Sequence, residues 1–239
     1  MRIDELHDEL CAGFIDAGAT PVDQLLPLRY NGKKADAVFV PERVIVEVKS
    51  LFDDSLESTR LRTNFDRIVL EWMKKGGPII FGTVNLDLSD LPPAMAEEMI
   101  SYVGERVRTG LKDANRQIRA TAEMLDWDDF HGIAVFASPA HFKTHPGVIA
   151  RAAWDLLRRS DQAPLLNGLM TFWVPVEDRP GQLMIIPHPR GERSIPVGIY
   201  ERMGRGFAAR FAAEKGAQLD RQISDESEFM GRFMGPAYD

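Results

Sequence analysis

The chain has very little cysteine: Cys11 is the only one among 239 residues. A single cysteine excludes an internal disulfide and a cysteine zinc cluster, and it fits a reducing compartment. Long apolar runs are also missing, since no stretch approaches the roughly 20 residues that a transmembrane helix needs. The N-terminus shows no basic segment followed by an apolar run, so we expect no signal peptide. We therefore expect a cytoplasmic protein that does not contact a membrane.

Positive charge is not in excess either. The chain has 29 lysine and arginine residues against 36 aspartate and glutamate residues, which gives a net charge of −7. This balance argues against a protein that coats nucleic acid indiscriminately, although it allows a local basic cleft. Hydrophobic residues make up 44% and charged residues 27% of the chain, and these proportions are typical of a folded globular protein.

Helical and strand patterns alternate along the chain and predict an α/β fold with a central mixed sheet flanked by helices. Helical spacing of apolar residues predicts helices at residues 3–16, 56–75, 92–125, 146–159 and 201–215, the third of them open to a break near Gly104 or Gly110. Short apolar runs predict strands at 79–84, 132–137, 168–176, 182–187 and 195–200, in addition to a hairpin within residues 33–51.

No repeat and no low-complexity linker divides the chain, so we expect one domain over residues 1–216. Within it, we expect a core over residues 1–140 and a C-terminal extension of strands and a helix over residues 141–216. Residues 217–239 form an acidic tail without a regular pattern.

The hairpin expected within residues 33–51 carries charges in an otherwise apolar segment. Glu47 and Lys49 alternate with valines along its second strand, so both side chains point to the same face of the sheet. Antiparallel pairing across a turn at residues 41–43 would bring Asp36 near them. Charges in such a strand are unfavourable unless they are paired or bind a cation.

Two carboxylates and a lysine in this arrangement suit metal-assisted hydrolysis of a phosphodiester. Carboxylate oxygens are ligands for Mg²⁺, and the bound ion polarises the phosphate and activates a water molecule. On this interpretation Asp36 and Glu47 bind the metal, the Val48 carbonyl is a further ligand, and Lys49 stabilises charge that develops on the phosphate.

The spacing of these residues resembles that of the PD-(D/E)XK nuclease superfamily, which has the restriction-endonuclease-like fold. Asp36 is followed, after ten residues, by Glu47-Val48-Lys49 at the end of a strand rich in valine and isoleucine. The resemblance covers a little over half of the chain and implies an α-β-β-β-α-β core. It also implies a Mg²⁺ or Mn²⁺ cofactor and a nucleic acid substrate, with DNA expected first. Ala35 stands where the family has proline.

The same resemblance implies two more members of the site. Many members place an acidic residue of the first helix at the metal; Glu9 is the candidate here and Glu5 the alternative, and the sequence does not choose between them. Some branches add a glutamine on the helix after the core sheet, which corresponds to Gln117 in this chain. That segment ends in Thr121, where exonuclease branches have tyrosine. One site per chain would favour a homodimer if both strands of a duplex are cut.

A second class of function stays open. An acid–X–lysine triplet also occurs as a simple ion pair, and Glu9 and Gln117 could be surface residues of their helices. A catalytically inactive nuclease-fold protein that binds or scaffolds a partner would carry the same carboxylates. The basic residues could either contact phosphates or pair with acidic neighbours; they are Arg106, Arg108, Lys112, Arg116, Arg119, Arg190, Arg193, Arg202, Arg205 and Arg210.

Overall fold

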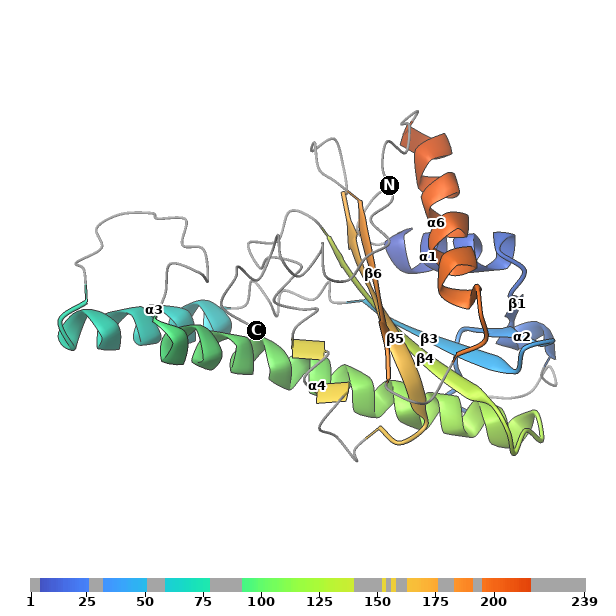
Figure 1. The fold of residues 1–239 in the computed structure, drawn as a ribbon, viewed down its shortest axis with the longest axis horizontal. Helices are drawn as coiled ribbons and strands as arrows, with labels where there is room; N and C mark the ends of the chain where they lie inside the picture. Colours follow the sequence, from blue (N-terminus) through green and yellow to red (C-terminus); the bar gives the residue numbers. More distant parts are fainter. Residues whose placement is uncertain are drawn as a thin grey trace.

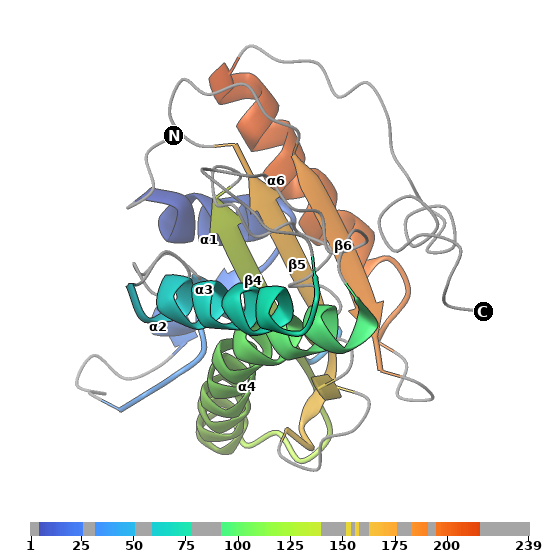
Figure 2. The same ribbon diagram turned by 90° about the vertical axis from the view of Figure 1, so that its left-hand side faces the viewer.

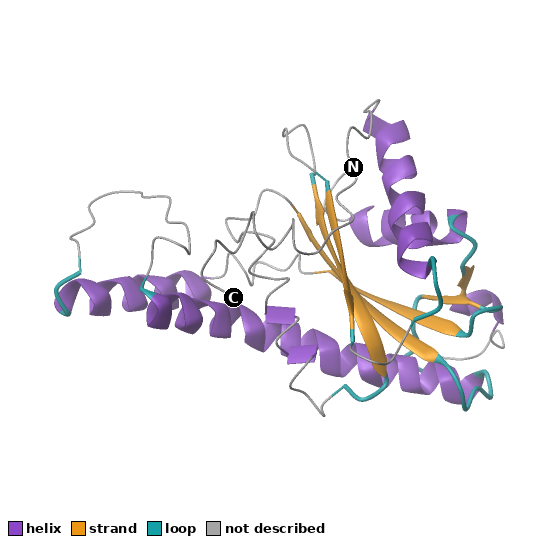
Figure 3. Cartoon of the chain, viewed as in Figure 1, coloured by secondary structure: helices purple, strands orange, loops and turns teal. Residues whose placement is uncertain are grey.

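A single mixed sheet of six strands forms the centre of the described chain, with helices packed on both of its faces (Figures 1 and 3). The structure is a computed structural model that describes residues 5–25, 32–50, 59–77, 92–139, 152–153, 156–157, 163–175, 183–190 and 195–215. The expected α/β class with a central mixed sheet is confirmed.

The strands follow one another across the sheet in the order in which they occur along the chain. They are β1 (Thr20–Pro21), β2 (Ala37–Phe39), β3 (Val44–Ser50), β4 (His131–Pro139), β5 (Leu166–Val174) and β6 (Met184–Pro189). β3, β4 and β5 run parallel, and the outer strands pair antiparallel with their neighbours. β3, which carries Glu47 and Lys49, therefore lies inside the sheet between β2 and β4.

The helices are α1 (Leu6–Asp16), α2 (Val22–Leu25), α3 (Thr59–Lys74), α4 (Pro93–Met124) and α6 (Ile199–Lys215), and residues 152–153 and 156–157 are also helical. α4 starts with a proline. Proline lacks a backbone N–H, and this costs nothing in the first turn of a helix because the N–H groups there have no partner within the helix. α4 runs unbroken through Gly104 and Gly110, so the expected break does not occur. None of the helices in the described ranges has the length and apolar composition needed to cross a membrane.

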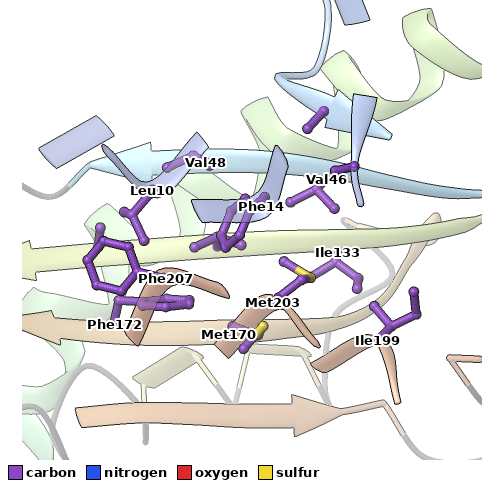
Figure 4. Packing of buried hydrophobic residues seen from close by; sticks show 14 of the residues in the cluster. Leu10, Phe14, Val46, Val48, Ile133, Met170, Phe172, Ile199, Met203 and Phe207 are labelled. Carbon is purple, nitrogen blue, oxygen red and sulfur yellow. The ribbon is translucent and has the colours of Figure 1, made fainter. Parts of the chain in front are cut away.

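α1 and α6 cover one face of the sheet. Figure 4 shows Leu10 and Phe14 of α1 directed at the same apolar layer as Phe172 of β5 and Phe207 of α6. The rings of Phe172 and Phe207 meet edge to face, with centroids 5.4 Å apart. The two helices cross closely because Gly13 lacks a side chain: a Cβ there would lie 2.7 Å from the Cα of Phe207. This contact sets the rotation of α1 about its own axis.

α4 covers the opposite face of the sheet and extends beyond it, where α3 lies alongside (Figures 1 and 2). Leu111 and Ile118 pack with Ile45 and Phe136 in the second apolar layer. Gly110 lets the helix approach the sheet, since a Cβ there would lie 2.7 Å from Cε1 of Phe136 and 3.7 Å from Cγ of Lys49. α4 is thus held directly over the strand that carries the predicted site.

Most of the predicted elements that fall on described residues are confirmed. The helices expected at 3–16, 56–75, 92–125 and 201–215 correspond to α1, α3, α4 and α6, and the strands expected at 132–137, 168–176 and 182–187 correspond to β4, β5 and β6. The strand expected at 195–200 is wrong. Residues 195–196 have no regular structure, Val197 and Gly198 form a turn in which Gly198 has a φ of 84°, and Ile199 begins α6.

Some predicted elements lie outside the described residues. They are the strand at 79–84, most of the helix at 146–159 and the acidic tail at 217–239. The division into a core over residues 1–140 and an extension over residues 141–216 stays a prediction.

Candidate metal and catalytic site

The hairpin formed by β2 and β3 places Asp36 close to Glu47. Ala37 and Val46 are the last paired residues of β2 and β3 at this end; Asp36 directly precedes Ala37, and Glu47 directly follows Val46. The Asp36 N–H donates to the Val46 carbonyl at 3.1 Å, and the Val48 N–H donates to Asp36 Oδ2 at 2.7 Å. Asp36 is also close enough for its charge to raise the pKa of Glu47. The two carboxylates are therefore neighbours, anchored by the backbone of the central strand.

Glu47 is a buried carboxylate with only part of its hydrogen-bonding capacity used. Its side chain is 2% exposed, and Oε1 accepts a hydrogen bond from Lys49 Nζ at 2.5 Å. Oε2 has no hydrogen-bond partner among the described residues. Burial raises the pKa of Glu47 to about 8; the negative charge of Asp36 acts in the same direction, whereas Lys49 lowers the pKa. Lys49 offsets part of the charge of this carboxylate through Oε1, and Oε2 stays without a hydrogen-bond partner among the described residues.

Lys49 and Gln117 are brought together at the same place. Lys49 Nζ donates to Gln117 Oε1 at 2.6 Å, and Gln117 Nε2 donates to the carbonyl of Lys34 at 3.0 Å. One turn further along α4, the hydroxyl of Thr121 accepts the N–H of Ala35 at 2.8 Å, and this side chain is fully buried. The two α4 residues therefore fix both the lysine and the segment that leads into Asp36.

α1 contributes a histidine and a cysteine to the surroundings of Asp36. His7 Nε2 lies 3.4 Å from Asp36 Oδ1 and 3.8 Å from Cys11 Sγ, and the three donor atoms lie within 4.8 Å of one another. Hydrogen bonding to Asp36, assisted by Cys11, raises the pKa of His7 to about 10 despite partial burial. Burial raises the pKa of the Cys11 thiol. His7 is thus the residue of the first helix that contacts the hairpin carboxylate.

The structure does not bring Glu9 to these residues. The Glu9 carboxylate forms an ion pair with Arg210 of α6. At about 100° per residue, Glu9 lies roughly 200° around α1 from His7, on the opposite flank of the helix. Glu5, the alternative candidate, precedes α1 as its N-cap residue. The resemblance directed attention to the acidic residues of α1 only. The sequence does contain another pair of possible metal ligands there, His7 and Cys11, which lie one helical turn apart beside the apolar stripe.

Many of the basic residues expected to contact phosphates have partners inside the chain. The guanidinium of Arg190 donates to the carbonyls of Ala163 and Leu166. Five others form ion pairs: Arg108 with Glu105, Arg116 with Asp113, Arg202 with Glu42, Arg205 with Glu201 and Arg210 with Glu9. The side chains of Arg106 and Arg193 lie outside the described part of the structure. For these five arginines the alternative of pairing with acidic neighbours holds.

The chain was compared with protein-family models, with curated proteins and with solved structures. None matches. What this site can do must therefore be inferred from its own geometry. Asp36 lies between Glu47, with Lys49 and Gln117 behind it, and the imidazole and thiol of His7 and Cys11. Carboxylates, imidazole and thiol are groups that bind divalent cations.

Proposed function

We propose that this chain is a Mg²⁺- or Mn²⁺-dependent nuclease, with DNA as the expected substrate. The observation that carries the proposal is the buried carboxylate of Glu47, which lies close to Asp36 and keeps one oxygen without a hydrogen-bond partner among the described residues. Lys49 pairs with one oxygen of Glu47 only; a buried carboxylate with its other oxygen unsatisfied is unfavourable, and a second carboxylate beside it adds repulsion. A divalent cation held by both side chains removes both penalties, and hard carboxylate oxygens are the donors that Mg²⁺ prefers.

The side chains around this pair fit hydrolysis of a phosphodiester. Asp36 and Glu47 would hold the ion, which when bound polarises a phosphate oxygen and lowers the pKa of a water molecule. The ammonium group of Lys49 stabilises the negative charge that develops on the phosphate. Gln117 is a positioning residue, because it holds Lys49 at 2.6 Å and ties it to the Lys34 carbonyl.

The order of elements also supports the proposal. α1, β1, β2, β3, α4 and β4 follow one another as α-β-β-β-α-β, with α2 and α3 in addition. This is the order that the resemblance to the PD-(D/E)XK nucleases implies. In the structure, however, the first of the three strands is the two-residue β1, and the third is β3 rather than the strand expected at 79–84. β4 lies parallel to β3 and in register with Glu47 through Ala134.

A non-catalytic binding or scaffolding protein of the same fold is the second candidate. Its support is the pairing of the arginines described above, which engages cations that a polynucleotide would otherwise contact. Lys49 is likewise satisfied by Glu47 and Gln117. On this alternative the site is a structural cluster of charges.

Cleavage assays separate the two candidates. The purified chain is incubated with single-stranded and duplex DNA and RNA in Mg²⁺, Mn²⁺ or a chelator, and compared with Glu47→Gln and Lys49→Ala. Exposed Glu97→Gln and Lys74→Ala serve as matched controls. We expect ion-dependent cleavage that Lys49→Ala lowers about 10²- to 10³-fold, as for loss of one group that stabilises developing charge. Folded wild-type protein that cuts no substrate, or site variants that cut as fast as the controls, would exclude the nuclease.

A further inference from the structure

We propose that His7, Cys11 and Asp36 form a second cation site, built for a borderline ion such as Zn²⁺ rather than for Mg²⁺. This site lies on the α1 side of Asp36, whereas Glu47 lies close to Asp36 on the neighbouring strand. The proposal does not depend on nuclease activity, because binding can be measured without a substrate.

Two of the three spacings between the donor atoms are close to those around a tetrahedral zinc ion, and the third lies within 4.8 Å. With Zn–N and Zn–O distances of about 2.0–2.2 Å and a Zn–S distance of about 2.3 Å, tetrahedral geometry places N and O about 3.4 Å apart and N and S about 3.6 Å apart. In the structure His7 Nε2 lies 3.4 Å from Asp36 Oδ1 and 3.8 Å from Cys11 Sγ. The helix supplies this spacing directly, since His7 and Cys11 are four residues apart on one face of α1.

Hydrogen bonding alone accounts less well for the arrangement. One ring nitrogen, Nε2, faces both Cys11 and Asp36, and a single N–H can point at only one of them. A charge-assisted hydrogen bond between an imidazolium and a carboxylate would also be shorter, at about 2.7–2.9 Å. An ion bound between the three groups explains why their donor atoms lie near one another at distances longer than those of strong hydrogen bonds.

The donor set selects the class of ion. Imidazole and thiolate favour Zn²⁺ and its close relatives, whereas Mg²⁺ prefers oxygen ligands and avoids sulfur. Asp36 can serve this site through Oδ1, because Oδ2 is held by the Val48 N–H at 2.7 Å. Binding releases the Cys11 thiol proton and the imidazolium proton of His7 to solvent, because the ion takes the thiolate and the neutral imidazole. Three protein ligands leave a fourth position for water, the arrangement of open zinc sites.

Co²⁺ tests the proposal, because it replaces Zn²⁺ and gives a thiolate charge-transfer band in the near ultraviolet. Cys11 is the only cysteine, so such a band has a single source in this chain. We expect the band in the full-length wild type, its displacement by Zn²⁺ but not by Mg²⁺, and its loss in Cys11→Ser. His7→Asn should weaken binding at least about tenfold. Asp16→Asn, a carboxylate on the opposite flank of α1, should bind as the wild type does.

A second measurement uses the wild type alone, in case Cys11→Ser fails to fold. Zn²⁺ should slow alkylation of Cys11, because a thiolate held by the ion is not free to attack the reagent, and Mg²⁺ should not slow it. Absence of the cobalt band in folded wild-type protein overturns the proposal, and so does alkylation that Zn²⁺ leaves unchanged. A band that persists at full affinity in His7→Asn would also overturn it. Failure of the nuclease proposal would leave these results unaffected.

Discussion

Replacing Glu47 by glutamine should make the metal-free protein more stable at alkaline pH. Glutamine keeps the size of the side chain and removes the carboxylate that burial and Asp36 disfavour. Because the pKa of Glu47 in the folded state is raised from 4.5 to about 8, the folded chain holds a proton that the unfolded chain releases. The contribution of Glu47 to the free energy of unfolding of the wild type is therefore fully present below about pH 4.5 and is lost as the pH rises through about 8.

The size of this effect follows from the pKa. At about 1.4 kcal/mol per pKa unit, the change from 4.5 to about 8 corresponds to roughly 5 kcal/mol of lost stability once Glu47 is ionised in both states. Glu47→Gln carries no such penalty. The difference in unfolding free energy between variant and wild type should thus be small at about pH 5 and several kcal/mol in favour of the variant at about pH 9.

Urea unfolding of chelator-treated protein at the two pH values measures this difference directly. Exposed Glu97→Gln is the control and should differ from the wild type equally at both. At alkaline pH, Mg²⁺ should stabilise the wild type, by about 2.7 kcal/mol at a hundred times its dissociation constant, and should do little for Glu47→Gln. If the two curves keep a constant separation between the two pH values, Glu47 is an ordinary carboxylate and the reasoning about the site fails.

Three further predictions concern the supports of the site. Thr121→Val leaves the buried N–H of Ala35 without its acceptor and should lower the unfolding free energy by about 1–3 kcal/mol in urea; Thr109→Val, at an exposed position of the same helix, should change it by less than about 0.5 kcal/mol, and equal effects would contradict this role of Thr121. Gly110→Ala should destabilise by about 1–3 kcal/mol, because its Cβ would lie 2.7 Å from Cε1 of buried Phe136. Gly104→Ala, whose Cβ meets no described atom within 4 Å, should be neutral or stabilising by up to about 1 kcal/mol, and the reverse order in thermal melts would show that α4 does not approach the sheet as described. His7, with its pKa raised to about 10, should remain protonated at about pH 8 in the metal-free protein and contribute stability that is full below about pH 6.5 and lost towards about pH 10; an ordinary midpoint near 6.5 in an NMR titration would refute its contact with Asp36.

The parts of the fold that were predicted correctly are those in which burial leaves a regular pattern in the sequence. The valines of β3 alternate because every second side chain enters the layer under α1. Residues 195–199 imitate that alternation, with Ile195, Val197 and Ile199 at every second position. Pro196 and Gly198 break it, since proline lacks an N–H for a ladder and Gly198 turns the chain at a φ of 84°. β1 was missed because two residues carry no period.

The candidate site also has a part that the sequence predicts and a part that it does not. Asp36, Glu47 and Lys49 could be placed together from the sequence because hairpin register fixes which residues oppose each other. The contribution of α1 could not, because it depends on how that helix is rotated about its axis. The close crossing with α6, where a Cβ on Gly206 would lie 2.3 Å from the Gly13 carbonyl oxygen, sets this rotation. It turns Glu9 towards Arg210 and His7 towards Asp36.

The central claim is that Glu47 and Asp36 together bind a hard divalent ion, and Mn²⁺ titration followed by electron paramagnetic resonance tests it most directly. Bound Mn²⁺ loses the sharp signal of the free ion. The claim predicts saturable Mn²⁺ binding by the wild type, displacement by Mg²⁺, and loss of binding in Glu47→Gln but not in Glu97→Gln. Wild-type protein that leaves the free-ion signal unchanged, or Glu47→Gln that binds Mn²⁺ as tightly as the wild type, would contradict it.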